Sequence, residues 1–246
     1  VEATVEYITS NLPETERKLS SGSQLDIPAG PVADGELFIE VLGMDGAELP
    51  HSGQIYIDLV EELRIARLLK REDSYKIEVK LELPTSQGFG MSAAGLVAVA
   101  RAFRTLSKKG TDEQFLRLAH RVERMHGSGL GDVLGISAEG VELRLEPGAP
   151  GAGGKVVSFT THQPLLLVWK PDESRHTSTY IDDEGWQRSI SKAGERSVSR
   201  LRLKEWNFER WADLMLESRN FAEASGLLNE EVRKDLLSKV QKEILR

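Results

Sequence analysis

A glycine-rich loop at residues 84–95 has the residue types that bind phosphate groups. It reads PTSQGFGMSAAG, and Gly88 and Gly90 would let its backbone approach a ligand closely. An alternating segment precedes the loop and an alanine-rich segment follows it, which predicts the order strand, loop, helix. Free N–H groups and the positive end of the helix dipole would then face a di- or triphosphate, and the Ser92 hydroxyl could ligate Mg²⁺.

Two common nucleotide motifs do not account for this loop. It lacks the Lys-Ser/Thr pair of a P-loop, and its spacing differs from the dinucleotide-binding fingerprint. A Gly-x-Gly pair by itself is typical of a tight connection between a strand and a helix. That structural alternative stands for the two glycines alone, so the choice depends on the rest of the string.

Two carboxylates that could serve phosphoryl transfer follow in a second segment. Glu123 stands near the end of an expected helix, and Asp132 comes nine residues later in a glycine turn. Phosphoryl transfer needs anionic ligands for Mg²⁺ and a group that orients or deprotonates the attacking hydroxyl. In the structural alternative, Glu123 pairs with Arg121 or Arg124 on a solvated face. Asp132 would then only cap the next helix, but the upstream phosphate loop favours catalysis.

These residues must be positioned by an alternation of strands and helices. Thr111 followed by Gln114 is a capping-box pattern and predicts the start of the helix that carries Glu123. Hydrophobic periodicity predicts the other elements. The expected strands are residues 1–8, 36–42, 76–83, 141–145, 155–159 and 164–169, and the expected helices are residues 55–70, 91–106, 111–125 and most of the chain from about 185 onward.

Composition excludes several classes of function. The formal charge of −7 leaves no overall basic surface for a nucleic-acid backbone. The chain has no cysteine, which excludes disulfides, thiolate metal sites and thiol nucleophiles. Its apolar runs are far shorter than the roughly 20 residues that a membrane-spanning helix needs. We therefore expect a soluble, cytoplasmic protein with no nucleic-acid or membrane partner.

The string at residues 84–94 resembles the second motif of the GHMP kinase superfamily, commonly Pro-x-x-x-Gly-Leu-Gly-Ser-Ser-Ala-Ala. Phe89 replaces the leucine and Met91 replaces the first serine, and neither change removes a backbone donor. The resemblance implies that ATP is bound by this loop. Its nucleotide-binding residues would be Gly88, Phe89, Gly90, Met91, Ser92, Ala93 and Ala94.

The acidic segment resembles the same superfamily. Mevalonate-kinase-like members have a Glu-Arg-Met segment before a glycine turn that ends in the catalytic aspartate, as residues 123–132 do here. By that likeness Ser92 and Glu123 would hold Mg²⁺, and Asp132 would act on the acceptor hydroxyl. The archaeal pantoate kinase family is more similar still, because it shares the motifs at residues 87–94, 129–133 and 147–151.

This closer likeness implies transfer of the γ-phosphoryl group of ATP to the 4-hydroxyl of pantoate, in coenzyme A synthesis. His120 and Arg144 would contact the acceptor, with the Arg144 guanidinium binding the carboxylate of pantoate. Thr177 would add a hydroxyl contact. In the structural alternatives, His120 is a helix histidine whose hydrogen bonds are made within the protein, and Arg144 points outward from a strand into solvent. Other members act on mevalonate, homoserine or shikimate, and a non-catalytic sensor of ATP and a metabolite is a further alternative.

The implied fold is α+β, the GHMP kinase fold, with an N-terminal half like domain 2 of ribosomal protein S5 and a ferredoxin-like C-terminal half. Residues 1–160 would be the nucleotide-binding part with the phosphate loop and the catalytic aspartate, and residues 161–246 the C-terminal part. The first and third motifs of the family are not found, so we expect a chain that is incomplete at both ends. A homodimer is an open alternative for its assembly.

Overall fold

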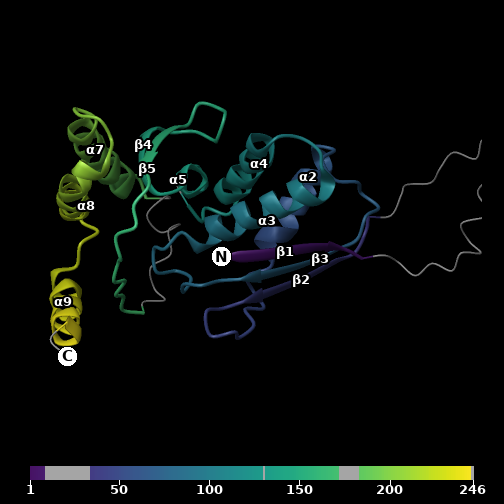
Figure 1. Cartoon of the computed structure of the whole chain (residues 1–246), viewed down its shortest axis with the longest axis horizontal. Helices are drawn as coiled ribbons and strands as arrows, with labels where there is room; N and C mark the ends of the chain where they lie inside the picture. Colours follow the sequence, from purple (N-terminus) through teal and green to yellow (C-terminus); the bar gives the residue numbers. More distant parts are fainter. Residues whose placement is uncertain (9–33, 130, 172–182, 245–246) are drawn as a thin grey trace, which may run out of the picture.

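The computed structural model describes residues 1–8, 34–129, 131–171 and 183–244 (Figure 1). It is a mixed α/β structure. In chain order its elements are β1 (Glu2–Tyr7), β2 (Leu37–Leu42), α2 (Gln54–Ile65), β3 (Tyr75–Lys80), α3 (Met91–Ser107), α4 (Asp112–Met125), α5 (Asp132–Ala138), β4 (Val141–Glu146), β5 (Lys155–Phe159), α7 (Glu184–Leu201), the short 3-10 helix η1 (Phe208–Arg210), α8 (Trp211–Ser225) and α9 (Glu230–Ile244).

A three-stranded sheet in the order β1-β3-β2 supports the phosphate loop. β1 runs antiparallel to β3, and β2 runs parallel to it. A parallel pair needs a crossover connection, which α2 provides. Along β3 the side chains of Tyr75, Ile77 and Val79 are fully buried while the residues between them are exposed. One face of the sheet is therefore covered, and it holds β3 in place just before the loop.

Helices α2 and α3 cover this face, and α4 packs against both of them, as Figure 1 shows. Their shared core includes Leu59, Leu63, Leu96 and Phe103, none of which is exposed. The phosphate loop connects β3 at the centre of the sheet to α3 in the helical layer. Both ends of the loop are thus anchored in the core.

The predicted capping box at the start of α4 is confirmed. The Thr111 hydroxyl accepts a hydrogen bond from the Gln114 N–H at 3.3 Å, and the Gln114 side chain accepts one from the Thr111 N–H at 2.9 Å. Asp112 and Glu113 lie in the first turn, where they complement the helix dipole. This start sets the length of α4, whose last turns carry His120 and Glu123.

A hairpin of β4 and β5 stands beside α5 and is buttressed by aromatic residues from the C-terminal part. The Trp206 indole N–H donates to the Val141 carbonyl at 2.9 Å, and the Trp206 ring lies 5.5 Å from that of Phe159. Phe208 also packs edge-on against Phe159. The Trp206 and Phe208 side chains therefore pack against the β4–β5 hairpin.

The C-terminal part differs from the expectation in one respect. Residues 164–169 do not form the predicted strand, and the side chains of Leu165, Leu166 and Leu167 are 63%, 65% and 45% exposed. An apolar run forms a strand only where another strand pairs with it, and none of the described strands pairs with residues 164–169. From residue 160 onward the described residues form helices and no strand, so a ferredoxin-like half is not seen in them.

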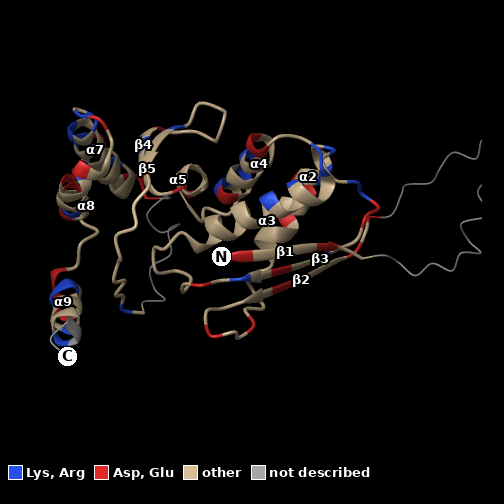
Figure 2. Ribbon diagram, in the orientation of Figure 1, with Lys and Arg blue, Asp and Glu red and all other residues tan. Residues whose placement is uncertain are grey.

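The charged residues of α7, α8 and α9 are mixed in sign (Figure 2). Arg200 of α7, for example, pairs with Glu217 of α8 at 3.2 Å. Such mixing is typical of a solvated surface and does not form a basic patch for nucleic acid. Within the part of the chain that the structure describes, no helix has the length and apolar character to cross a lipid bilayer.

Candidate active site

The phosphate loop has the backbone conformation that its glycines allow. Gly88 and Gly90 have φ of 79° and 65°, in the left-handed region that favours glycine. Gly90 is the N-cap of α3, and no side chain caps the first N–H groups of that helix. A Cβ atom at Gly88 would meet nothing within 4 Å. The loop therefore presents uncapped N–H groups beside open space, as anion binding requires.

The start of α5 packs directly on this loop. A Cβ atom at Gly90 would lie 3.6 Å from Cδ1 of Ile136 and 4.0 Å from Cβ of Asp132. The Asp132 side chain is 35% exposed, so its carboxylate is accessible to a ligand. The structure thus brings the predicted carboxylate next to the predicted phosphate cradle, although 42 residues separate Gly90 and Asp132.

A cavity of about 1230 Å³ opens at this junction. One wall consists of residues 86–92, 126–128 and Asp132, and the other wall includes residues 168–171 and apolar side chains of α9. The rings of Phe89 and Trp169 meet edge-on at 5.7 Å and connect the two walls. Small-molecule sites usually measure about 300–1,000 Å³, so the cavity has room for a nucleotide and a second substrate.

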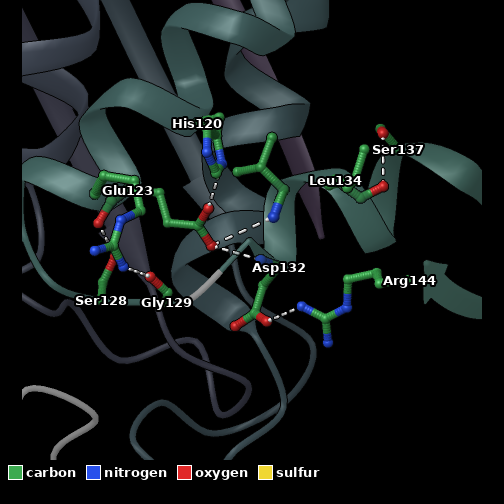
Figure 3. A network of polar contacts seen from close by, with 10 residues as sticks. His120, Glu123, Ser128, Gly129, Asp132, Leu134, Ser137 and Arg144 are labelled. Carbon is green, nitrogen blue, oxygen red and sulfur yellow. Dashed lines mark hydrogen bonds and ion pairs between the residues drawn. The ribbon is translucent and has the colours of Figure 1, made fainter. Parts of the chain in front are cut away.

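Glu123 lies behind Asp132 and is fully buried. Figure 3 shows its carboxylate between α4 and the start of α5. Oε1 accepts hydrogen bonds from the N–H groups of Asp132 at 2.9 Å and Val133 at 3.3 Å, and Oε2 lies 3.1 Å from Nδ1 of His120. Both carboxylate oxygens are therefore engaged within the protein.

Two structural alternatives from the sequence are wrong, namely that Glu123 pairs with an arginine on a solvated face and that Asp132 only caps the next helix. Glu123 does not lie on a solvated face with an arginine, because it is buried and bonded to α5. The Asp132 side chain does not cap a helix: α5 follows Gly131 with no side-chain cap at the N-cap position, and Glu123 accepts the first N–H groups instead.

Burial, and then the nearby charge of Asp132, raise the pKa of Glu123 to about 7, although the hydrogen bonds from α5 and the charge of Arg144 oppose this. Burial, and then the charge of Arg124, lower the pKa of His120. A neutral imidazole with its proton on Nδ1 would donate to Oε2 of Glu123.

This raised pKa predicts a pH dependence of stability. A carboxyl with a higher pKa in the folded chain binds its proton more tightly there, so ionisation lowers the free energy of unfolding as pH rises from 4.5 to about 7. The loss is on the order of 3 kcal/mol at most. We expect Glu123→Gln, which cannot ionise, to lack this decline in urea unfolding measured across the same pH range. Parallel pH profiles for the two proteins would contradict the prediction.

Arg144 of β4 approaches Asp132 from the opposite side. Its Nη1 donates to Oδ1 of Asp132 at 3.0 Å, and its Nε lies 3.2 Å from Oε1 of Glu142 (Figure 3). Burial raises the pKa of Glu142. The guanidinium is partly exposed, so it is accessible to a ligand beside Asp132.

Most of the predicted site residues fall into two groups. Ala93 and Ala94 are exceptions, because they lie in the first turns of α3 and do not line the cavity. Those that line the cavity are Gly88, Phe89, Gly90, Met91, Ser92 and Asp132. Behind this wall lie His120, Glu123 and Arg144, each joined directly or through Glu123 to Asp132. Thr177 is outside the residues that the structure describes.

Some residues of the cavity wall were not predicted. His126 lines the cavity and its Nε2 lies 2.6 Å from Oδ2 of Asp58, which ties the end of α4 to α2. Its place directly before the glycine turn was the signal that could have identified it. Lys170 and Arg233 bring positive charge to the opposite wall, and no local pattern in the sequence indicates that they face the phosphate loop.

Residues 58–140 match the family model of the GHMP kinases N terminal domain. Several curated proteins named pantoate kinase are also similar to the chain. The protein of Thermococcus kodakarensis is 36% identical over 147 residues, covering 60% of this chain and 46% of that protein. The protein of Methanocaldococcus jannaschii is 27% identical over 220 residues, covering 89% and 77%. The protein of Methanospirillum hungatei is 29% identical over 187 residues, covering 76% and 57%.

A solved structure described as a phosphotransferase related to the CoA biosynthesis pathway is similar in fold. It superposes with a TM-score of 0.60 and 26% sequence identity, over 81% of this chain and 62% of that one. The chain spans about half the length of the Thermococcus relative, and 77% of the Methanocaldococcus one.

Proposed function

Because the chain belongs to the GHMP kinase family, we propose that it transfers the γ-phosphoryl group of ATP to the 4-hydroxyl of pantoate. The products would be ADP and 4-phosphopantoate, an intermediate in coenzyme A biosynthesis. The observation that carries the proposal is that the Asp132 side chain lies beside Gly90, at the uncapped start of α3, and lines the same cavity as the phosphate loop.

The loop would bind the phosphates of ATP through its main chain. The uncapped N–H groups at the start of α3 point to where the phosphates would lie, and the small residues 92–94 leave them accessible. Such donors are fixed before the reaction, so they would stabilise the charge on the transferring group without rearrangement. Catalysis would come mainly from positioning and from neutralising this charge.

The residues at the cavity fit a magnesium ion bound together with phosphate oxygens. Mg²⁺ usually takes one or two carboxylates plus substrate phosphates, and the Ser92 hydroxyl and the Asp132 carboxylate are among the oxygen donors of the residues that line the cavity. The family resemblance adds Glu123, which would first have to release a hydrogen bond to His120 or α5. When bound, the ion would neutralise phosphate charge and orient the γ-phosphoryl group.

Asp132 would orient the acceptor hydroxyl or accept its proton during attack. An acceptor whose hydroxyl is held by Asp132 would also lie close to Arg144, because the Arg144 and Asp132 side chains are only 3.0 Å apart. Arg144 would exchange its contact with Asp132 for the carboxylate of pantoate, which matches its planar guanidinium. By the family resemblance Thr177 would add a hydroxyl contact, whereas His120 would reach the acceptor only after releasing Glu123, to which its Nδ1 lies at 3.1 Å.

We also propose the division of the chain at about residue 160. Residues 1–160 would form the nucleotide-binding part, like domain 2 of ribosomal protein S5, and residues 161–246 would form the C-terminal part. The cavity supports this division, because its two walls come from the two sides of that boundary.

The proposal is tested by ADP release from the full-length protein with Mg-ATP. Pantoate, mevalonate, homoserine and shikimate would be offered in parallel. We expect turnover with pantoate alone. Turnover with another alcohol would leave the kinase mechanism and reject pantoate as the acceptor, and ligand binding without any turnover would reject the activity.

Removal of the Ser92 hydroxyl should weaken the binding of Mg²⁺ at the active site. We expect Ser92→Ala to raise the Mg²⁺ concentration at half-maximal rate by about tenfold, as the loss of one contact to a charged group does. The measurement is a Mg²⁺ titration at fixed ATP. Ser107→Ala removes a hydroxyl at the other end of α3 and should leave the titration unchanged. Identical curves for the two variants would contradict a role of Ser92 in holding the ion.

A further inference from the structure

The hydrogen bonds of Glu123 suggest a different task for it than binding an ion. A carboxylate that ligates Mg²⁺ needs an oxygen that is open to the ligand, but Glu123 is 0% exposed and does not line the cavity. Its Oε1 accepts from two successive N–H groups at the start of α5, and its Oε2 contacts His120. Helix α5 has no other side-chain cap at this end.

We propose that Glu123, oriented by His120, is a positioning residue that fixes the start of α5 and so holds Asp132 against the phosphate loop. The inference rests on the proposed function, because it assigns how the reacting carboxylate of that function is kept in place. It also assigns His120 to the support of Glu123 and not to contact with the acceptor.

Two hydrogen bonds from the end of α4 hold Ser128 and Gly129 in the turn that precedes Asp132. The Glu123 carbonyl accepts a hydrogen bond from the Ser128 N–H at 3.2 Å, and Arg124 donates to the Gly129 carbonyl at 3.0 Å. In Figure 3, Ser128 and Gly129 lie together to one side of the Glu123 carboxylate, which points toward His120 and Asp132. The end of α4 therefore organises the turn through the Glu123 carbonyl and the Arg124 side chain, and it organises the start of α5 through the Glu123 side chain.

Asp132 is consequently held from two directions. Its main-chain N–H is bound by Glu123, and its side-chain Oδ1 is bound by Arg144 of β4. Arg144 is partly exposed and can be drawn away by a ligand, whereas Glu123 is enclosed. Glu123 is thus the contact that persists if the acceptor displaces Arg144, and its loss would free α5 to shift relative to the loop.

Two substitutions at Glu123 separate this role from metal binding. Glutamine keeps a carbonyl oxygen that can accept both N–H groups but loses the negative charge, whereas alanine loses the acceptor. We expect slow amide hydrogen exchange at Asp132 and Val133, measured by NMR, in the wild type and Glu123→Gln. We expect it to be lost in Glu123→Ala. This readout requires no turnover.

In ADP release, we expect Glu123→Gln to stay within about tenfold of the wild-type kcat, as the weakening of one hydrogen bond would allow. Glu123→Ala should lose about 100-fold in kcat, the size of effect that a misplacement of about 1 Å produces. The Mg²⁺ concentration at half-maximal rate should be the same in wild type and Glu123→Gln. Glu62→Gln, at a buried carboxylate of α2 outside the site, is the matched control and should match the wild type.

Two results would overturn the inference even if Glu123→Ala failed to fold. If Glu123→Gln raised the required Mg²⁺ concentration strongly while Asp132 and Val133 kept their slow exchange, Glu123 would be an ion ligand. Fast exchange of these two amides in the wild type would equally reject the cap. Absence of turnover with pantoate would instead reject the proposed function, and the exchange result would still decide whether Glu123 fixes α5.

Discussion

Replacement of Asp132 by asparagine should lower kcat for phosphoryl transfer by about 10³-fold, in the range that general acid–base groups contribute. Asparagine keeps the size of the side chain and an oxygen for Arg144, but it cannot accept the proton of the acceptor hydroxyl. Stability should change little, because the Asp132–Arg144 pair is partly exposed and such pairs contribute at most about 1 kcal/mol. Steady-state ADP release and thermal melting of the full-length protein measure the two effects.

The chain offers a closely matched control for this substitution. The Asp112 side chain is 37% exposed, against 35% for Asp132, and it also lies close to arginine side chains, 3.6 Å from Arg101. It stands at the start of α4, away from the cavity. Asp112→Asn should therefore retain kcat. If Asp132→Asn kept more than about a tenth of the wild-type kcat, a loss smaller than such groups usually cause, Asp132 would not be the catalytic carboxylate.

Local signals in the sequence were sufficient to predict the elements that carry the site. The strand before the loop, α3 after it and the capping box of α4 each depend on residues within one or two turns of each other. Gly88 and Gly90 have the backbone conformation that their type indicates. The matching domain at residues 58–140 includes all of these features.

Interactions between distant elements were not predictable in the same way. Glu123 is charged and has arginine neighbours in the sequence, so periodicity cannot show that it is buried. Its burial depends on α5 folding back to supply two N–H groups. Likewise, the Arg144 contact with Asp132 depends on where β4 lies relative to α5.

In the C-terminal part, too, the structure depends on contacts between distant elements that the local sequence does not indicate. Residues 164–169 are apolar enough for a strand, yet a strand forms only where a neighbour offers its hydrogen bonds. The far wall of the cavity comes partly from α9, whose own pattern reads only as a charged amphipathic helix. Such partners are chosen by tertiary packing, which no local window contains.

Substitution of Gly129 by alanine should disable the site without touching any proposed catalytic group. Oε1 of Glu123 occupies the place that the new Cβ would take, and Oδ2 of Asp132 lies only 3.0 Å from it. The methyl group must therefore displace both carboxylates or move the turn. We expect kcat to fall by about 100-fold, as misplacement of a reacting group does. Overpacking should also lower the free energy of unfolding by about 2 kcal/mol. ADP release and urea unfolding measure the two effects.

The control for Gly129→Ala must add a methyl group where there is room. Gly53 has negative φ, and its Cβ would make ordinary contacts of 3.6 Å and 3.9 Å with Ile39. Gly53→Ala should therefore leave kcat and stability near the wild-type values. Double substitution is equally informative, because Glu123→Gln retains the clashing side chain and should not rescue Gly129→Ala. Wild-type kcat in Gly129→Ala would mean that Glu123 and Asp132 need not be held together for catalysis, which would contradict the arrangement proposed for this site.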